Sequence, residues 1–164
     1  MAFGKYRHSN IRGDKGSNWN IEIWKDAFTG SSEEFSTSGD GFTITWNGSG
    51  GKRTPTFLGS QLTLNFLIKD NTDEAFVYNV LEGGFQTYYI RIYKGEVLDA
   101  NIWWYGWIQP SFDTIQNLSY PYSYNLVATD SAGYMNQLKP LSFVDENDKR
   151  TSSKILALIL SAFS

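Results

Sequence analysis

Cysteine is absent from this chain of 164 residues. Its absence excludes disulfide bonds, thiolate metal ligands and cysteine nucleophiles. There is a single histidine, His8, so a Ser-His-Asp arrangement would depend on that one side chain. We find no run of about 18 apolar residues and no apolar export signal after Met1. We therefore expect a protein made in the cytoplasm, with no membrane segment and no catalytic site.

The chain also lacks a large excess of charge of either sign. Fourteen Lys and Arg residues oppose 17 Asp and Glu residues, which gives a net charge of −3. This balance gives no indication of nucleic-acid binding. A row of oxygen donors occurs at 145–148, but it lacks the alternation and the glycine of common calcium loops. No glycine-rich phosphate loop is present, so we expect neither a metal nor a cofactor.

Alternating apolar and polar residues are the main pattern that is present. They predict strands over 19–25, 41–46, 61–68, 87–93 and 120–129. The spacing of apolar residues after Thr72 predicts one short helix that ends at Gly83-Gly84. The expected fold class is mainly β, as a barrel, split barrel or sandwich, with this internal helix and a second helix at the C-terminus.

Three regions follow from these patterns. Residues 1–18 are polar and are expected to form an N-terminal arm, and residues 19–144 to form the β-barrel-like domain. Residues 145–164 are expected to form a charged connector and the start of a helix that leads to a further domain. Apolar side chains, among them Ile155, Leu158 and Ile159, cover almost the whole circumference of that helix. Such a helix needs burial on several sides, so we expect it to contact another domain or subunit.

Tryptophan is concentrated at 102–108, where three of the six tryptophans fall within five residues. Strict alternation would place Ile102, Trp104, Gly106 and Ile108 on one face of a strand. Trp103, Tyr105 and Trp107 would then share the other face. Both faces are apolar, and a large exposed apolar face usually marks a binding surface. A sugar, a protein partner or a second core layer could cover the face of Trp103, Tyr105 and Trp107.

The order of the motifs resembles a known family. The segments that carry the resemblance are a strand ending at 23–24, then 42–46, 54–60, 62–66, 73–76, 88–94, 104–110, 120–122 and 128–130. They succeed one another as strand, glycine, aromatic, Ile-x-Pro, Pro-Tyr and Ala-x-Asp. This succession, over residues 19 to 163, resembles the N-terminal region of tail-tip or baseplate hub proteins of tailed bacteriophages.

The resemblance implies a tail-tube-like β-barrel that works as a structural part of the virion tail, without catalysis. It implies a homo-oligomer, a ring such as a trimer around the tail channel, and contacts with other tail proteins. The alternative function is a carbohydrate- or receptor-binding β-sandwich that uses an exposed aromatic strand face. On either reading Trp103, Tyr105 and Trp107 are the expected contact residues.

Overall fold

The computed structural model describes residues 2–13, 16–47, 59–84, 86–109 and 119–130. Its elements, in chain order, are β1 (Phe3–Arg12), β2 (Asn18–Asp26), β3 (Glu33–Glu34), β4 (Ser36–Asn47), β5 (Gly59–Ile68), α1 (Asn71–Glu82), β6 (Tyr88–Lys94), the 3-10 turn η1 (Asp99–Asn101), β7 (Ile102–Ile108) and β8 (Tyr122–Thr129). The predicted mainly β chain with one internal helix is confirmed. The predicted C-terminal helix, with Ile155, Leu158 and Ile159, lies outside the described residues.

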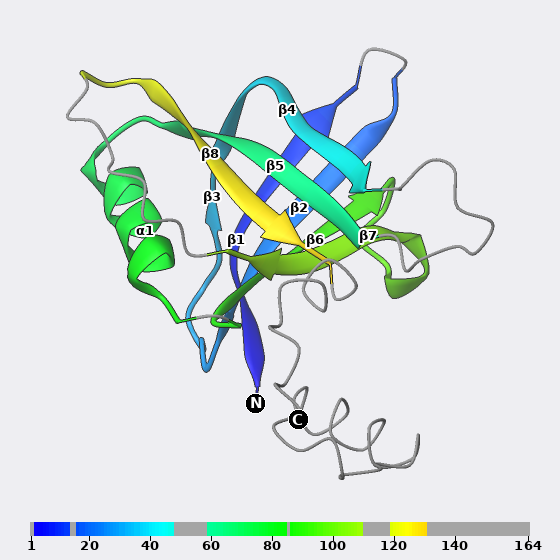
Figure 1. The fold of residues 1–164 in the computed structure, drawn as a ribbon, viewed down its shortest axis with the longest axis horizontal. Helices are drawn as coiled ribbons and strands as arrows, with labels where there is room; N and C mark the ends of the chain where they lie inside the picture. The colour runs from blue at the N-terminus through cyan, green and yellow to red at the C-terminus, as the bar shows by residue number, and fades with distance from the viewer. Residues whose placement is uncertain (1, 14–15, 48–58, 85, 110–118, 131–164) are drawn as a thin grey trace, which may run out of the picture.

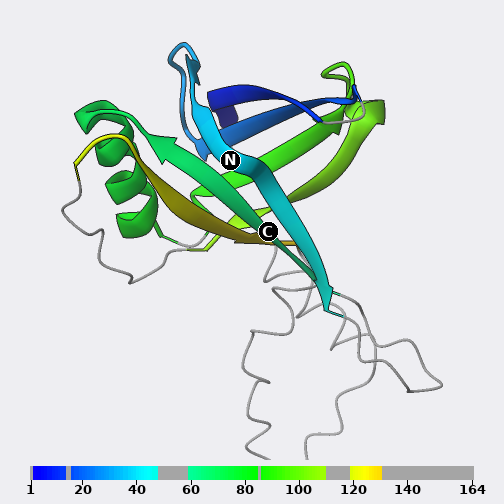
Figure 2. The same ribbon diagram turned by 90° about the horizontal axis from the view of Figure 1, so that it is seen from above.

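One mixed sheet contains all eight strands, in the order β3-β1-β2-β6-β7-β8-β5-β4. Every pairing is antiparallel except that of β3 with β1. Only Phe35 separates β3 at one end of this order from β4 at the other. The sheet therefore curves until its two ends share one stretch of chain (Figures 1 and 2). Strand pairing does not close it, so the predicted barrel is not confirmed.

The core lies inside this curve. Leu62, Leu64, Phe66 and Ile68 of β5 alternate with less buried neighbours, and all four are fully buried, as their spacing predicted. Helix α1 covers one end of the curved sheet (Figure 1). It packs three buried side chains into the same core cluster, those of Phe76, Val77 and Val80.

The expected polar arm at 1–18 is wrong for most of its length. Residues 3–12 form β1, which pairs with β2 along its whole length. The inward-facing residues of β1 include Arg7 and Ser9, both buried. A strand whose buried positions carry polar side chains has no apolar alternation, and the sequence pattern therefore failed to show it.

Helix α1 begins two positions earlier than predicted. Its N-cap is Asp70, not Thr72, and the Asp70 carboxylate accepts hydrogen bonds from the backbone N–H groups of Thr72 and Asp73. These bonds are the main reason that the pKa of Asp70 lies below its ordinary value. Capping at Asp70 satisfies two N–H groups of the first turn, which have no partner within the helix.

A buried ion pair joins β1 to α1. Arg7 Nη1 lies 2.6 Å from Asp73 Oδ1, and both side chains are more than nine-tenths buried. The guanidinium also lies 4.6 Å from the centre of the Phe76 ring and 3.1 Å (Nη2 to Oε2) from the exposed Glu33. Asp73 Oδ2 accepts a hydrogen bond from the Lys69 backbone N–H. The charges of Arg7 and Asp73 thus compensate each other beside the Phe76 ring.

Strands β7 and β8 approach each other closely at Gly106. A Cβ atom at this position would lie 2.4 Å from the Trp104 ring and 2.5 Å from the Thr129 carbonyl oxygen. Trp104 is itself held in place, because its Nε1–H donates a hydrogen bond to Ser60 Oγ (2.8 Å). Only glycine fits between this ring and the neighbouring backbone.

We predict that Asp73→Leu lowers the free energy of unfolding by about 3 kcal/mol or more, because it leaves Arg7 buried without its main partner. The double variant Arg7→Met/Asp73→Leu removes both charges and should recover a large part of this loss. Urea denaturation of the three proteins measures the coupling. Equal loss in the single and double variants would contradict a stabilising role for the pair.

We predict that Gly106→Ala costs about 1–3 kcal/mol of stability, because the new methyl group overlaps both the Trp104 ring and β8. Gly84→Ala is the matched control, since the nearest atom to a Cβ there is 3.7 Å away. Thermal unfolding of both variants tests this difference. Similar unfolding temperatures for the two variants would show that β7 and β8 can separate without cost.

Candidate functional site

A β-bulge in β7 decides which aromatic residues share a face. Trp104 pairs with Ile92 and Ile102 pairs with Tyr93, so Trp103 is the extra residue between two paired positions. Ile102 therefore lies on the same face as Tyr93. The predicted faces of β7 are therefore wrong for two residues. Ile102 lies on the outer face with Tyr105 and Trp107, and Trp103 does not.

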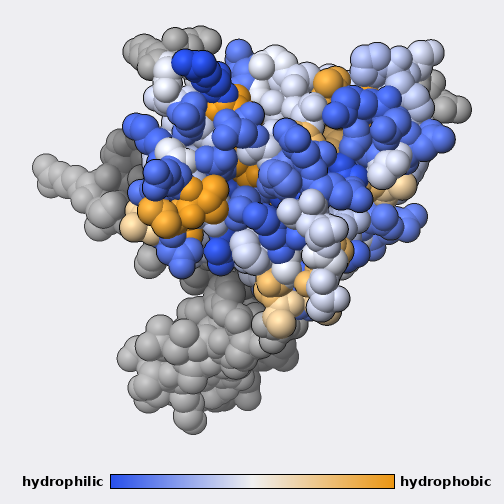
Figure 3. Space-filling view, turned by 180° about the vertical axis from the view of Figure 1, so that it is seen from behind, coloured by the Kyte–Doolittle hydropathy of each residue, from blue (hydrophilic) through white to orange (hydrophobic). Residues whose placement is uncertain are grey.

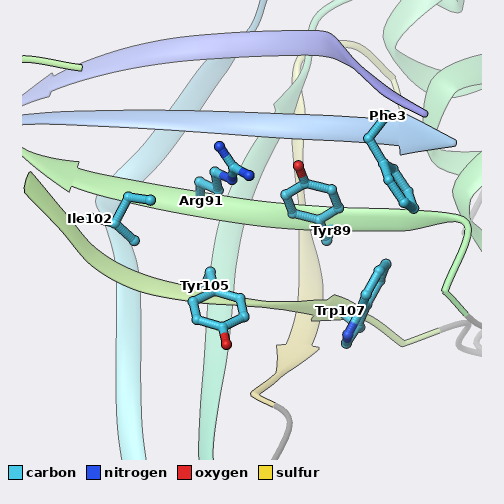
Figure 4. Close-up of a pocket in the computed structure, with 6 residues that line it drawn as sticks. All are labelled: Phe3, Tyr89, Arg91, Ile102, Tyr105 and Trp107. Carbon is cyan, nitrogen blue, oxygen red and sulfur yellow. The ribbon is translucent and has the colours of Figure 1, made fainter. Parts of the chain in front are cut away.

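The outer face carries a hollow of about 280 Å³. We call it the outer groove, and its lining residues are Phe3, Tyr89, Arg91, Ile102, Tyr105 and Trp107. They come from β1, β6 and β7 (Figure 4). Two of the three predicted contact residues, Tyr105 and Trp107, thus lie here. No sequence pattern marks Phe3, Tyr89 and Arg91 as site residues, because strand register alone brings them to β7.

Aromatic rings form a continuous row across this face. Phe3 lies 5.0 Å from Tyr89 and 5.7 Å from Trp107, and Tyr89 lies 5.4 Å from Trp107, all between ring centroids. On the other side of Tyr89 the ring of Trp24 in β2 is stacked at 6.0 Å. Four strands therefore each contribute one ring, and mutual packing fixes the wall of the outer groove.

Arg91 is the cation of the outer groove. Its guanidinium lies 4.8 Å from the Trp24 ring and 5.3 Å from the Tyr89 ring. Burial disfavours its charged form, but a hydrogen bond with Tyr93 and charge interactions with Tyr89 and Asp99 raise the pKa of Arg91 above its ordinary value. The side chain is therefore charged at every physiological pH.

A polar network supports the row from the same face. Glu22 is buried, and its carboxylate accepts hydrogen bonds from Trp24 Nε1 and the Tyr93 hydroxyl, both at 3.1 Å. Lys5 Nζ lies 3.3 Å from the other carboxylate oxygen. Burial raises the pKa of Tyr89, which keeps that ring in its neutral form. The groove is thus built on side chains whose own orientations are fixed.

Trp103, the third predicted contact residue, lies elsewhere. Its ring contacts Trp19 of β2 at 5.1 Å, and Trp19 in turn contacts Phe42 of β4 at 5.6 Å. A second hollow of about 370 Å³ opens beside these strands. Its lining residues are Ile11, Arg12, Gly13, Trp19, Gly39, Asp40 and Phe42. Trp103 is 47% exposed at this end of the sheet and takes no part in the outer groove.

A tyrosine cluster joins the start of β8 to α1. The hydroxyl groups of Tyr120 and Tyr122 both donate to the Glu74 carboxylate, and the two rings are stacked at 5.8 Å. The hydrogen bond to Glu74 is the main cause that raises the pKa of Tyr120 to about 12. Burial is the first cause for Tyr122, whose pKa is also raised to about 12, and Glu74 is the second.

The described residues offer no group of three or more His, Asp or Glu side chains that could hold a metal ion. Within the same residues, no helix has the length and apolar character needed to cross a membrane. The outer groove contains two of the predicted contact residues and is the candidate site; its chemistry is that of binding, with aromatic surfaces around one cation. Comparison of the chain with protein-family models, with curated proteins and with solved structures found no match.

We predict that stability falls between about pH 10 and pH 12 as the tyrosine cluster ionises. A phenol whose folded pKa exceeds its unfolded value of about 10 stabilises the fold fully below that value, and the contribution is lost as pH rises toward the folded pKa. Urea denaturation over this range measures the slope, which should be smaller in Tyr120→Phe/Tyr122→Phe. Glu74→Gln should let Tyr120 ionise earlier in an ultraviolet titration, and an unchanged titration would contradict the assignment.

Proposed function

We propose that this chain is a structural assembly component of a phage tail tip or baseplate hub, which forms ring contacts with its own copies and with other tail proteins. The resemblance in motif order suggests the family. The observation that carries the proposal is the edge of β4, which has only one neighbour among the described strands and offers a place for another subunit to add to the sheet.

Among the described strands, β4 pairs only with β5. Its second edge therefore presents backbone N–H and C=O groups that can pair with another chain. Trp46, near the end of β4, is 59% exposed, the largest exposure among the large hydrophobic side chains of the described residues. Proteins that remain monomeric usually protect a long edge strand with charge or proline. β4 carries one charged residue, Asp40, and its segment from Phe42 to Trp46 carries neither charge nor proline.

The opposite end of the sheet has a different character. β3 is only two residues long, and both residues, Glu33 and Glu34, are exposed acids. A short, charged edge discourages pairing with another chain. One end of the sheet is thus suited to association and the other is protected, so association is favoured at the β4 edge. A ring requires that this edge meet a different surface of the next copy, since such head-to-tail contacts generate rings when the rotation closes.

The shape of the sheet is consistent with a barrel-like wall. Glu33 and Glu34 pair with β1, whereas Ser36 and Thr37 pair with β5. The same short stretch therefore connects both ends of the strand order, as in a split barrel. The face seen in Figure 3 is mainly hydrophilic, and its hydrophobic residues lie in separate patches. This distribution favours contacts through edges over contacts through that broad face.

A role without catalysis is consistent with the hydrogen bonds of Ser60 and Asp130, which connect strands of the sheet. Ser60 accepts from Trp104, and both its backbone N–H and its hydroxyl donate to Asp130. This serine and this acid therefore hold β5, β7 and β8 together. His8 lies within β1, where its backbone pairs with Glu22 of β2. The Ser60 and Asp130 side chains thus act in the structure of the sheet.

We predict that the protein forms oligomers whose mass depends on concentration, and that Trp46→Lys weakens this association at least about tenfold. The change removes apolar burial and places an ammonium group at the contact. Size-exclusion chromatography with light scattering measures the effect. Leu98→Lys is the matched control, because Leu98 is 54% exposed and lies in the connection before β7, outside β4. Strictly monomeric wild-type protein, or equal loss in both variants, would overturn the proposal.

A further inference from the structure

The outer groove combines exposed aromatic rings with a fixed cation, and assembly through the β4 edge uses neither. We propose that the outer groove binds one acidic pyranose unit of a glycan, that is, a sugar ring that carries a carboxylate. The argument is independent of the assembly role, because the groove lies on β1, β6 and β7, whereas the assembly edge lies on β4.

The rings of the outer groove suit the apolar face of a sugar. A pyranose has one face of C–H groups that packs on aromatic rings, and hydroxyl groups around its edge. Tyr105 is 56% exposed, and Trp107 beside it on β7 is half-buried. Figure 4 shows Phe3 and Trp107 at one end of the groove and Ile102 at the other. A ring seated between these ends would leave its hydroxyl groups directed at water.

Arg91 supplies the selectivity for an acid. Its guanidinium lies 4.8 Å from the Trp24 ring centre and 5.3 Å from the Tyr89 ring centre, so contacts with both rings orient its fork before any ligand arrives. The only acid paired with it in the described residues is Asp99, at 3.7 Å, and the Asp99 side chain is 92% exposed. Such an exposed pair is weak, and an incoming carboxylate replaces it at small cost. Arginine and carboxylate then form a charge-assisted, bidentate contact.

The size of the outer groove favours a sugar ring over a peptide. Its volume of about 280 Å³ is just below the ~300–1,000 Å³ of typical small-molecule sites. Peptides that bind aromatic grooves are extended or helical and need several anchor pockets in a row. Here a single hollow is bounded at both ends.

The test compares two ligands that differ only in the carboxylate, methyl β-glucuronide and methyl β-glucoside. Titration of the full chain is followed by the NMR signals of the tryptophan indole N–H groups, with the Trp107 signal identified from Trp107→Phe. We expect the glucuronide to shift the Trp107 signal and to bind about tenfold more tightly than the glucoside. Arg91→Gln should abolish the preference, and Trp107→Ala should remove binding of both ligands.

Two controls separate a binding role from a folding role. Arg91→Lys keeps the charge without the planar fork, and it should retain part of the preference. Trp46→Ala changes an exposed tryptophan outside the outer groove, and it should bind like the wild type. Circular dichroism of each variant identifies any that has not folded. The Trp46→Lys protein should also bind normally, so failure of the assembly proposal leaves this one standing.

Three results would overturn the proposal. The first is wild-type protein that binds neither glycoside at tens of millimolar. The second is equal binding of the two glycosides, which would show that Arg91 does not select for the carboxylate. The third is a loss of oligomer mass in Arg91→Gln or Trp107→Ala with no glycoside binding by the wild type, which would identify the groove as a contact between copies of the chain.

Discussion

The fold depends on the place where the two ends of the sheet meet. Arg7 of β1 stands there, paired with Asp73 of α1 and close to Glu33 of β3. Phe35, the residue that follows β3, stacks on Phe66 of β5 with the two ring centroids 5.3 Å apart. The Phe35 backbone N–H also donates to the His8 carbonyl oxygen. One buried guanidinium therefore connects the first strand, the helix and the chain that passes from one end of the sheet to the other.

A charge at that position imposes a constraint on its neighbours. A buried arginine is costly unless it is paired and hydrogen-bonded, and its removal from water is compensated here by Asp73 and by the face of Phe76. The helix must then begin where Asp73 can reach Arg7, and the Asp70 cap sets that start. The N-cap, the ion pair and the curvature of the sheet are thus parts of one arrangement.

Sequence pattern predicted the elements whose buried faces are apolar and failed where they are not. β5 shows strict alternation, and its buried residues follow the prediction. β1 was missed because Arg7 and Ser9 occupy its buried positions. The bulge at Trp103 shifted the alternation in β7 by one residue, and no local signal marks it. The outer groove was visible only through Tyr105 and Trp107, since its other residues reach it through pairings between strands far apart in sequence.

Different interactions therefore fix the side chains on the two faces of the sheet. The inner face is apolar and is fixed by burial, with the Arg7 pair as its charged exception. The outer face near β6 is fixed by stacking between rings and by Glu22, which holds Trp24 and Tyr93 through hydrogen bonds. Because these groups already hold one another, the outer groove keeps its shape without a ligand. A preformed groove loses little conformational freedom on binding, and a weakly held sugar needs this advantage because few contacts are available to it.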